Sequence, residues 1–418
     1  MQIFKPADIL LPKQIDFTKW SVVACDQYTS EPEYWEEAGR TVGEEPSTLH
    51  LIFPEVYLEE EGGEERIARI NKQMQEYLDT GLFETLEQSF VYVVRTQRDG
   101  RVRHGIVGAI DLEAYDFTKG SQSPVRATEG TILERIPPRQ RIRAHAPLEL
   151  PHILVLIDDQ QGTVVEPLQQ QIGQFEKLYD FDLMMDSGHL TGYRLDKIAK
   201  QQVLKALEEL SKPETLKEKY GQEKQSLVYA IGDGNHSLAT AKTCWEELKK
   251  TLSPEQRQNH PARFALVELM NVYDEALQFE PIQRVVFEVE PQKLLSALKE
   301  YYPGASEDVQ EGQCIRYVYG GQEGAVYIKN APGRLAVGTL QQFLDDYLKK
   351  NGGRVDYIHG DDVVRRLAEK PGNIGFFLPN MEKTELFQTV LADGALPRKT
   401  FSMGEAEDKR FYCECKKI

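Results

Sequence analysis

The sequence has little cysteine and no long apolar run. Its five cysteines, at positions 25, 244, 314, 413 and 415, show no zinc-like spacing, so a reduced protein is the simplest interpretation. No stretch reaches the roughly 18 apolar residues of a membrane span. The opening MQIFKPADILLPKQIDF has neither an apolar segment nor a small-residue cleavage site. We therefore expect a cytoplasmic protein without a membrane partner.

Positive charge is also scarce. Lys and Arg total 50 against 67 Asp and Glu, which gives a net charge of −17. This excess argues against nucleic acid or an anionic membrane surface as the main partner. There is no low-complexity tract and no repeat of about 20 to 50 residues. Apolar residues make up 40% of the chain, enough for a normal core.

The length of 418 residues suggests two or three domains, or a single large one. The polar segment PETLKEKYGQEKQ, residues 213–225, is a possible boundary or surface helix. It divides the chain into an N-terminal region, 1–212, with an Arg-rich loop, and a C-terminal region, 213–418.

Apolar periodicity predicts a mixture of helices and strands. Apolar residues recur at helical spacing over 64–81 and 195–212, which predicts two helices. Asp99-Gly100 between two apolar runs indicates a hairpin. We also predict a helix over 164–181 and a strand over 333–340. The many hairpin-like runs favour an α+β fold, with mixed sheets and flanking helices, over a strict βαβ alternation.

One segment combines a strand, a tight turn and a helix. Residues 229–242 read YAIGDGNHSLATAK, with glycines on both sides of Asp233. A helix N-terminus with nearby glycines suits a phosphate or carboxylate. His236 can donate a hydrogen bond to such an anion or carry a proton, and Asp233 can hold a metal ion or orient a hydroxyl. The alternative is an ordinary turn in which Asn235 or Ser237 caps the helix.

This turn lacks the features of common nucleotide motifs. It has neither the third glycine of a dinucleotide fingerprint nor the Gly-Lys-Ser/Thr of a P-loop. The chain also contains no His-Glu-x-x-His and no nucleophile elbow. The local pattern therefore indicates an anion site without defining the anion.

A cationic segment stands out in this acidic chain. Residues 124–143 read PVRATEGTILERIPPRQRIR and contain five arginines and no lysine. Arg grips phosphate or carboxylate through two parallel hydrogen bonds. Pro137-Pro138 should stiffen the segment as a loop that presents its arginines. The alternative is a surface loop whose arginines pair with surplus acidic residues.

Three weaker signals lie elsewhere. Cys25 and Asp26 follow an apolar run, where Asp26 is a possible base and Cys25 a small core residue. Asp186 and His189 occupy a glycine-containing loop that could serve a hydrolase or lyase. Arg284, at a strand start, and Lys399, in LPRKTF, are possible anion contacts.

Several of these stretches together resemble the family catalogued as domain of unknown function 1015. IGDGNHSLATA is similar to its Asp-Gly-His-His-Arg turn, and VACDQYTSEPE to its Ala-Pro-Pro-Tyr-Asp-Val stretch. VRATEGT, FEPIQRVV and LPRKTF resemble its Arg-x-His-Glu, Pro-x-His-Arg and Pro-x-Lys-Ser segments, in the same order. The resemblance covers nearly the whole chain.

The chain looks like a divergent member of that family. Asn235, Ser237, Thr128 and Gln283 replace residues of the family pattern. The residues that match it are Asp233, Gly234, His236, Glu129, Arg126, Arg284 and Lys399.

The family's Asp-Gly-His-His-Arg turn is also similar to a turn in the ParB and sulfiredoxin superfamily, which includes ADP-dependent free-serine kinases. That resemblance implies a ParB/sulfiredoxin-like element around the turn and a phosphotransferase acting on a small hydroxyl- or carboxylate-bearing metabolite. The implied cofactors are Mg²⁺ and a nucleotide, ADP or ATP. A non-catalytic module that senses an anion or nucleotide is the alternative.

The phosphotransferase hypothesis gives each candidate residue a role. Asp233 would hold Mg²⁺, or Asp233 or Glu129 would take the acceptor proton, and His236 would donate to a phosphate oxygen. The remaining candidates would surround the nucleotide phosphates: Gly234, Asn235, Ser237, Arg126, Arg135, Arg284 and Lys399.

Overall fold

The computed structural model describes residues 2–221 and 227–418. It divides into two compact units, Met1–Leu277 with Gly404–Ile418, and Gln278–Met403. This division differs from a boundary at residue 212, because strands before and after that position hydrogen-bond within one sheet. Of the polar segment, α7 (Pro213–Tyr220) is helical, while 222–225 lie outside the described residues.

The first unit contains a ten-stranded mixed sheet with the order β10-β11-β4-β5-β13-β9-β12-β7-β6, and β1 pairs with β5. The pairs β13/β9, β12/β7 and β6/β7 are parallel, and the other neighbours are antiparallel. The strands are β1 (Phe4–Lys5), β4 (Val91–Thr96), β5 (Val102–Asp111), β6 (Tyr115–Asp116), β7 (Val125–Ala127), β9 (Leu154–Ile157), β10 (Glu176–Asp182), β11 (His189–Arg194), β12 (Tyr229–Asp233) and β13 (Phe264–Asn271).

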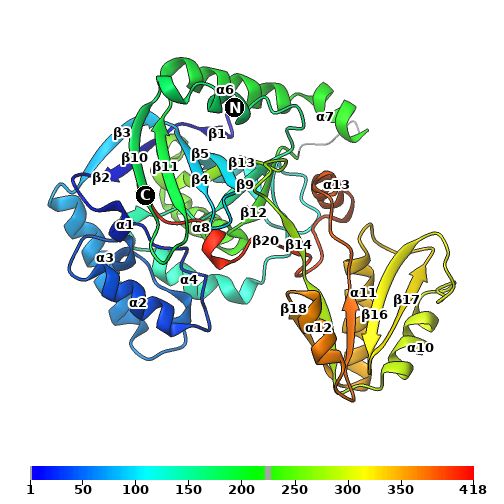
Figure 1. Cartoon of the computed structure of the whole chain (residues 1–418). Helices are drawn as coiled ribbons and strands as arrows, with labels where there is room; N and C mark the ends of the chain where they lie inside the picture. The colour runs from blue at the N-terminus through cyan, green and yellow to red at the C-terminus, as the bar shows by residue number, and fades with distance from the viewer. Residues whose placement is uncertain (1, 222–226) are drawn as a thin grey trace. The chain divides into compact units, whose positions relative to one another are not determined.

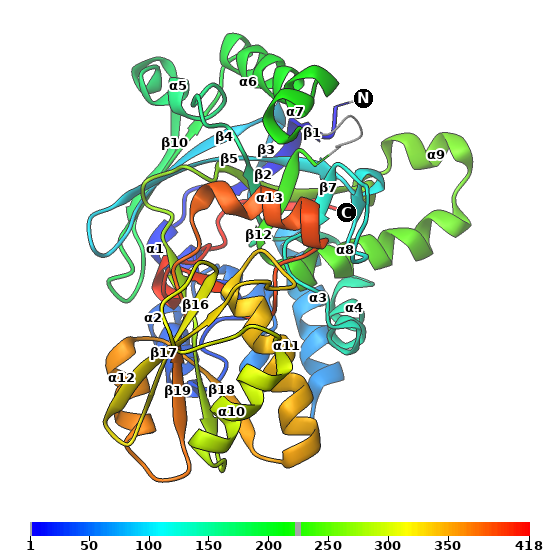
Figure 2. The ribbon, with the colours of Figure 1, turned by 90° about the vertical axis from the view of Figure 1, so that its right-hand side faces the viewer.

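Two small antiparallel pairs complete the strands of this unit, β2 (Ala7–Pro12) with β3 (Phe83–Ser89) and β8 (Leu148–Glu149) with β21 (Lys416–Lys417). Its other helices are α1 (Phe17–Trp20), α2 (Pro32–Val42), α3 (Gly63–Asp79), α4 (Ile136–Arg143), α5 (Glu166–Gln169), α6 (Lys197–Leu210), α8 (Asn235–Leu248) and α9 (Pro254–Asn259). From β12 the chain follows α8 and turns back through α9 (Figure 2).

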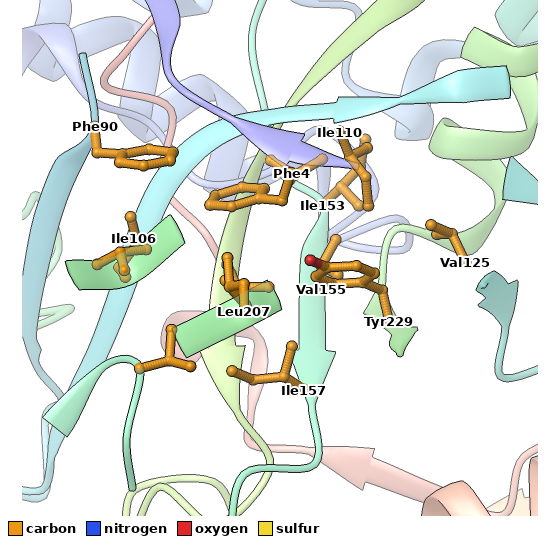
Figure 3. Packing of buried hydrophobic residues seen from close by; sticks show 14 of the residues in the cluster. Phe4, Phe90, Ile106, Ile110, Val125, Ile153, Val155, Ile157, Leu207 and Tyr229 are labelled. Carbon is orange, nitrogen blue, oxygen red and sulfur yellow. The ribbon is translucent and has the colours of Figure 1, made fainter. Parts of the chain in front are cut away.

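Both faces of the large sheet are buried. Along β5, Ile106 and Ile110 belong to the cluster that includes residues of α6 and α8, whereas Val107 and Ala109 belong to the cluster that includes residues of α2. This alternation follows from the two-residue period of a strand. In Figure 1, α6 lies on one side of β4 and β5, and α2 on the other. Figure 3 shows Ile110 of the first cluster beside Phe4, and Ile106 below Phe90, whose ring stacks on that of Phe4.

A buried ionic network ties the C-terminal segment to this sheet. Arg410, only 2% exposed, pairs with Glu268 of β13 at 2.7 Å and with Glu414. Buried charges are tolerated only when they are paired and hydrogen-bonded. The network therefore fixes the segment that carries Lys409 and Tyr412, two residues of the site described below.

The second unit is an antiparallel sheet covered by helices. Its strand order is β17-β16-β19-β15-β18, and β14 pairs with β20 separately. Figure 2 shows α12 on one side of this sheet and α10 and α11 on the other. The elements are β14 (Phe279–Pro281), β15 (Gln283–Phe287), α10 (Pro291–Tyr301), β16 (Gln313–Tyr319), β17 (Gln322–Ile328), α11 (Ala336–Asn351), β18 (Arg354–Ile358), α12 (Asp361–Ala368), β19 (Ile374–Phe377), α13 (Lys383–Asp393) and β20 (Phe401–Met403).

The predicted α+β fold of mixed sheets and flanking helices is confirmed, as is the hairpin at Asp99-Gly100 between β4 and β5. Two local predictions are wrong. The segment 164–181, expected to be one helix, contains the short helix α5 and then the strand β10. The second half is a strand because it pairs with β11. The strand expected over 333–340 is largely the start of α11, whose apolar residues continue at helical spacing.

All five cysteines are free. Within the two described ranges, no helix is long and apolar enough to cross a membrane.

Candidate functional site

The predicted strand, turn and helix are confirmed. Asp233 ends β12, α8 begins at Asn235, and Gly234 between them has a φ of +78°. A Cβ atom at Gly234 would lie 3.0 Å from Cα of Ile153. The turn therefore requires glycine for two reasons, a left-handed backbone and a close approach to Ile153, the residue before β9.

The first turn of α8 has no side-chain cap among the described residues. The alternative with Asn235 or Ser237 as the cap is wrong, since Gly234 holds that position. Asn235 instead accepts a hydrogen bond from the Thr128 amide at 3.2 Å, which joins the turn to the segment after β7. Because no described side chain accepts a capping bond there, amide groups of this helix end remain available to an anion.

The acidic and imidazole groups of the turn have defined partners. Asp233 Oδ1 accepts from the Gly234 amide at 2.9 Å, and Oδ2 lies 3.4 Å from Nζ of Lys409. His236 Nε2 accepts from the Ile132 amide at 3.2 Å. This bond places the proton of a neutral His236 ring on Nδ1. Glu129 is half-buried, one residue after Thr128.

Ser237 belongs to a chain of hydrogen bonds that the sequence did not indicate. Its Oγ lies 2.7 Å from Nε2 of His152, and Nδ1 of His152 lies 2.8 Å from the Tyr412 hydroxyl. That hydroxyl also accepts from the Cys25 amide at 3.1 Å. His152 and Tyr412 are 8% and 2% exposed, so the chain is shielded from solvent. Burial raises the pKa of Tyr412 well above its ordinary value, so it stays a neutral phenol.

Acidic groups flank this chain. Burial disfavours the charged form of Asp26, but His152, Gln27 and Lys409 outweigh it, so the pKa of Asp26 lies below its ordinary value. Burial raises the pKa of Glu55, and Asp26 nearby adds to the shift. Asp26 is thus a carboxylate beside the imidazole of His152.

The Arg-rich segment is helical rather than a loop. Its two prolines lie in the first turn of α4, where a missing amide proton costs little. The alternative of pairing with acidic residues holds for three arginines: Arg139 with Glu55, Arg141 with Glu64, and Arg143 with Glu149.

The two arginines of this segment that are predicted to contact phosphate lie in different settings. Arg126 is 3% exposed on β7 and donates to the Ser123 carbonyl at 2.7 Å. Arg135 is exposed directly before α4, and its carbonyl accepts from Arg139 at 2.8 Å. Arg126 therefore supports the backbone before β7.

A cavity of about 150 Å³ adjoins the start of α8. Its wall includes residues of α3, α4, α8 and β8, and apolar residues make up just over half of the whole lining. The polar and charged lining residues are Cys25, Glu55, Arg139, Arg143, Glu149, His152, Ser237, Thr240 and Tyr412. Ser237 and the buried histidine beside it thus place one polar part of this wall directly against the first turn of α8.

Glu149 is the most buried charge of that wall. Burial opposes its ionisation, but Lys416 and Arg143 outweigh this effect and lower the pKa of Glu149. It lies 2.5 Å from Arg143 and 3.3 Å from Lys416, and accepts from the Leu266 amide at 2.8 Å.

The remaining candidates lie away from these groups or in the other unit. Arg284 and Lys399 belong to the second unit, where the buried Arg284 donates to the Arg398 carbonyl at 2.8 Å. Asp186 is exposed in the turn between β10 and β11, and His189 bonds instead to Asp180 and Asp182, at 2.6 and 2.7 Å. The Asp186 and His189 side chains are thus not hydrogen-bonded to each other.

No group of three or more His, Cys, Asp or Glu side chains in the described part of the chain is arranged to hold a metal ion. Asp233 offers one carboxylate, already shared between an amide and an ammonium group. Mg²⁺ usually keeps several waters and binds through one or two carboxylates together with substrate phosphates. A Mg²⁺ ion bound here would therefore have to be held largely by substrate phosphates.

Residues 5–388 match the family described as protein of unknown function DUF1015, and the chain belongs to this family. No curated protein matches the sequence. Similar solved structures include a free serine kinase variant in complex with ADP, at 11% identity and a TM-score of 0.39, over 77% of this chain and 94% of that one. C-terminally truncated SbnI from Staphylococcus aureus has 10% identity and a TM-score of 0.36, over 71% and 83%. A conserved hypothetical protein from Pyrococcus furiosus has 11% and 0.36, over 75% and 94%.

Proposed function

We propose that the first unit binds ADP or ATP at the start of α8 and transfers a phosphoryl group to a small hydroxyl- or carboxylate-bearing metabolite in the adjoining cavity. One observation carries this proposal: Ser237 lies in the uncapped first turn of α8 and also in the cavity wall. A phosphate at the helix end and an acceptor in the cavity would therefore be neighbours. Phosphoryl transfer depends mainly on such positioning and on charge neutralisation.

Each residue around the turn has its own role in binding the nucleotide. The amide groups and dipole of the first turn attract the phosphates, and Lys409 moves from Asp233 to a phosphate oxygen. Asp233, relieved of that partner, would help to hold a nucleotide-bound Mg²⁺, which would neutralise charge on the phosphates. His236 holds the 130–132 segment beside the turn through the Ile132 amide. His236 is therefore a positioning residue in this proposal.

His152 is the proposed proton acceptor. The acceptor oxygen forms a bond to phosphorus, the bond from phosphorus to the leaving nucleotide oxygen breaks, and the acceptor's proton passes to Nε2 of His152. Asp26 stabilises the resulting imidazolium by its negative charge. Asp233 and Glu129 remain the alternative proton acceptors that the sequence suggests, and Gly234, Asn235 and Ser237 remain predicted contacts of the nucleotide.

Thermal stability and ³¹P NMR test this function. With Mg²⁺ present, ADP or ATP at 100 times its Kd should stabilise the folded protein by about 2.7 kcal/mol. Lys409→Ala should weaken that response, whereas Lys417→Ala, an exposed lysine of β21, should not. The proposal fails if neither nucleotide raises the melting temperature and no phosphorylated product forms.

A binding-only role is the second candidate. The observation that favours it is the engagement of Asp233 by an amide and by Lys409, which ties up the carboxylate best placed for Mg²⁺. Nucleotide binding without product over a long incubation would support a regulatory module. Measured turnover that His152→Gln abolishes would support the enzyme.

A further inference from the structure

The cavity beside α8 is small and mainly apolar. Its volume of about 150 Å³ is close to that of an engineered apolar cavity that holds benzene. Apolar side chains from several elements line it, among them Leu51, Phe53, Met74, Ile142 and Leu266. A guest of about six to eight non-hydrogen atoms with an apolar body matches this space.

The charged side chains of the wall already have partners. Arg139 pairs with Glu55, and Arg143 pairs with Glu149 at 2.5 Å. A charged guest would have to break one of these pairs or remain unpaired in a largely apolar space, and both are unfavourable. A neutral guest leaves every pair intact.

The same wall offers a hydrogen-bonding patch next to the first turn of α8. Ser237, His152 and Tyr412 are joined by bonds of 2.7 and 2.8 Å, so they form a continuous polar surface. The Ser237 hydroxyl can both donate and accept, which lets it bind one hydroxyl of a guest while it keeps its bond to His152. Polyhydroxy compounds would leave further hydroxyls unsatisfied against apolar side chains.

We infer that this cavity takes a neutral alcohol with a compact apolar body, whose hydroxyl binds Ser237 and His152. This inference rests on the proposed phosphoryl transfer for the alcohol's role as acceptor. Occupancy of the cavity does not require a nucleotide, so the two proposals can fail separately. The inference narrows the acceptor class from hydroxyl- or carboxylate-bearing metabolites to apolar alcohols.

Benzyl alcohol is a suitable probe, with toluene as the analogue that lacks the hydroxyl and L-serine and glycerol as polar comparisons. Binding to the full chain is measured by saturation-transfer NMR and calorimetry without nucleotide. Benzyl alcohol should bind about tenfold more tightly than toluene, and this preference should largely disappear in Ser237→Ala. L-Serine and glycerol should bind at least tenfold more weakly.

Two substitutions of the same kind test the location. Ala146→Phe fills the cavity from its wall and should reduce benzyl alcohol affinity at least tenfold. Ala144→Phe, two residues away and exposed, should leave it unchanged. If Ala146→Phe does not fold, Ile142→Ala enlarges the same cavity instead and should improve the binding of 4-ethylbenzyl alcohol.

The outcomes separate the inference from the proposed function. Benzyl alcohol binding that Ala146→Phe abolishes supports the inference, even if no nucleotide binds. Equal binding of L-serine or glycerol, undiminished binding in Ala146→Phe, or no binding of benzyl alcohol to a protein that still binds ADP would overturn it.

Discussion

Gly234 is the residue on which the site's geometry depends most directly, and Gly234→Ala should both destabilise the first unit and weaken its nucleotide response. Alanine in the left-handed region costs roughly 1 to 2 kcal/mol. Its Cβ would also lie 3.0 Å from Cα and 3.1 Å from Cγ1 of Ile153. Because a backbone atom cannot yield as a side chain does, this contact adds an overpacking cost of roughly 1 to 3 kcal/mol. We expect a total loss of about 3 kcal/mol.

Two other glycines of the same unit separate these contributions. Gly100, in the hairpin turn, has a φ of +87°, but no atom lies within 4 Å of the place that a Cβ atom would take, so Gly100→Ala should cost only about 1 kcal/mol. Gly39 lies inside α2 in open space, and Gly39→Ala should stabilise by about 0.5 to 1 kcal/mol. The difference between Gly234→Ala and Gly100→Ala then measures the collision with Ile153.

Tryptophan fluorescence is a selective assay for this series. The three tryptophans, Trp20, Trp35 and Trp245, all lie in the first unit. A loss of about 3 kcal/mol should lower the melting temperature seen by fluorescence by roughly 6 to 12 °C. A Gly234→Ala protein as stable as Gly100→Ala, with an unchanged response to ADP, would refute the argument that this turn requires glycine.

Three further outcomes follow from buried groups of the first unit. Arg410→Met removes the cation paired with the buried Glu414 and leaves the buried Glu268 with only the more distant Arg103, so it should cost roughly 3 kcal/mol in urea unfolding. The same change at the exposed Arg40 should have little effect on unfolding. Folding lowers the pKa of Glu149, so the ionised carboxylate stabilises the fold fully above about pH 4.3, and this contribution is lost as the pH falls through the lowered pKa. The difference in melting temperature between wild type and Glu149→Gln should therefore shrink in acid. Burial, with the nearby acidic groups, raises the pKa of Cys25 to about 12, so peptide mass spectrometry should find it unmodified by iodoacetamide at pH 8 until the protein is unfolded.

Sequence patterns predict those elements of the fold that are determined by residues close to one another in the chain. The turn at Asp233 could be predicted because adjacent residues determine it: an apolar strand, a glycine and a helical run. The segment of α4 resembles a loop in sequence because Pro137 and Pro138 break helices in the interior, although they do not in the first turn. The helix predicted over 164–181 is wrong because β10 obtains its stability from pairing with β11, which no short window contains.

The partners of Ser237 show why the site itself was harder to predict. His152 precedes Ser237 by 85 positions, and Tyr412 follows His152 by 260. Neither residue stands in a motif, and a lone histidine or tyrosine carries no spacing signal. Only the pairing of β9 with β12, and the buried ionic network at Arg410, bring these side chains to the start of α8.

The serine at position 237 links the chain's departure from its family pattern to the chemistry of the cavity. Where the pattern has arginine, a serine side chain adds no charge to the wall and is short enough to bond His152 at 2.7 Å. An arginine there would add a cation beside the paired Arg139 and Arg143, and the buried wall would then favour an anionic guest. Ser237→Arg should therefore abolish benzyl alcohol binding, and a gain of affinity for a carboxylate such as benzoate would show that this one position sets the charge of the guest. Unchanged alcohol binding in a folded Ser237→Arg protein would mean that the side chain does not face the cavity's occupant.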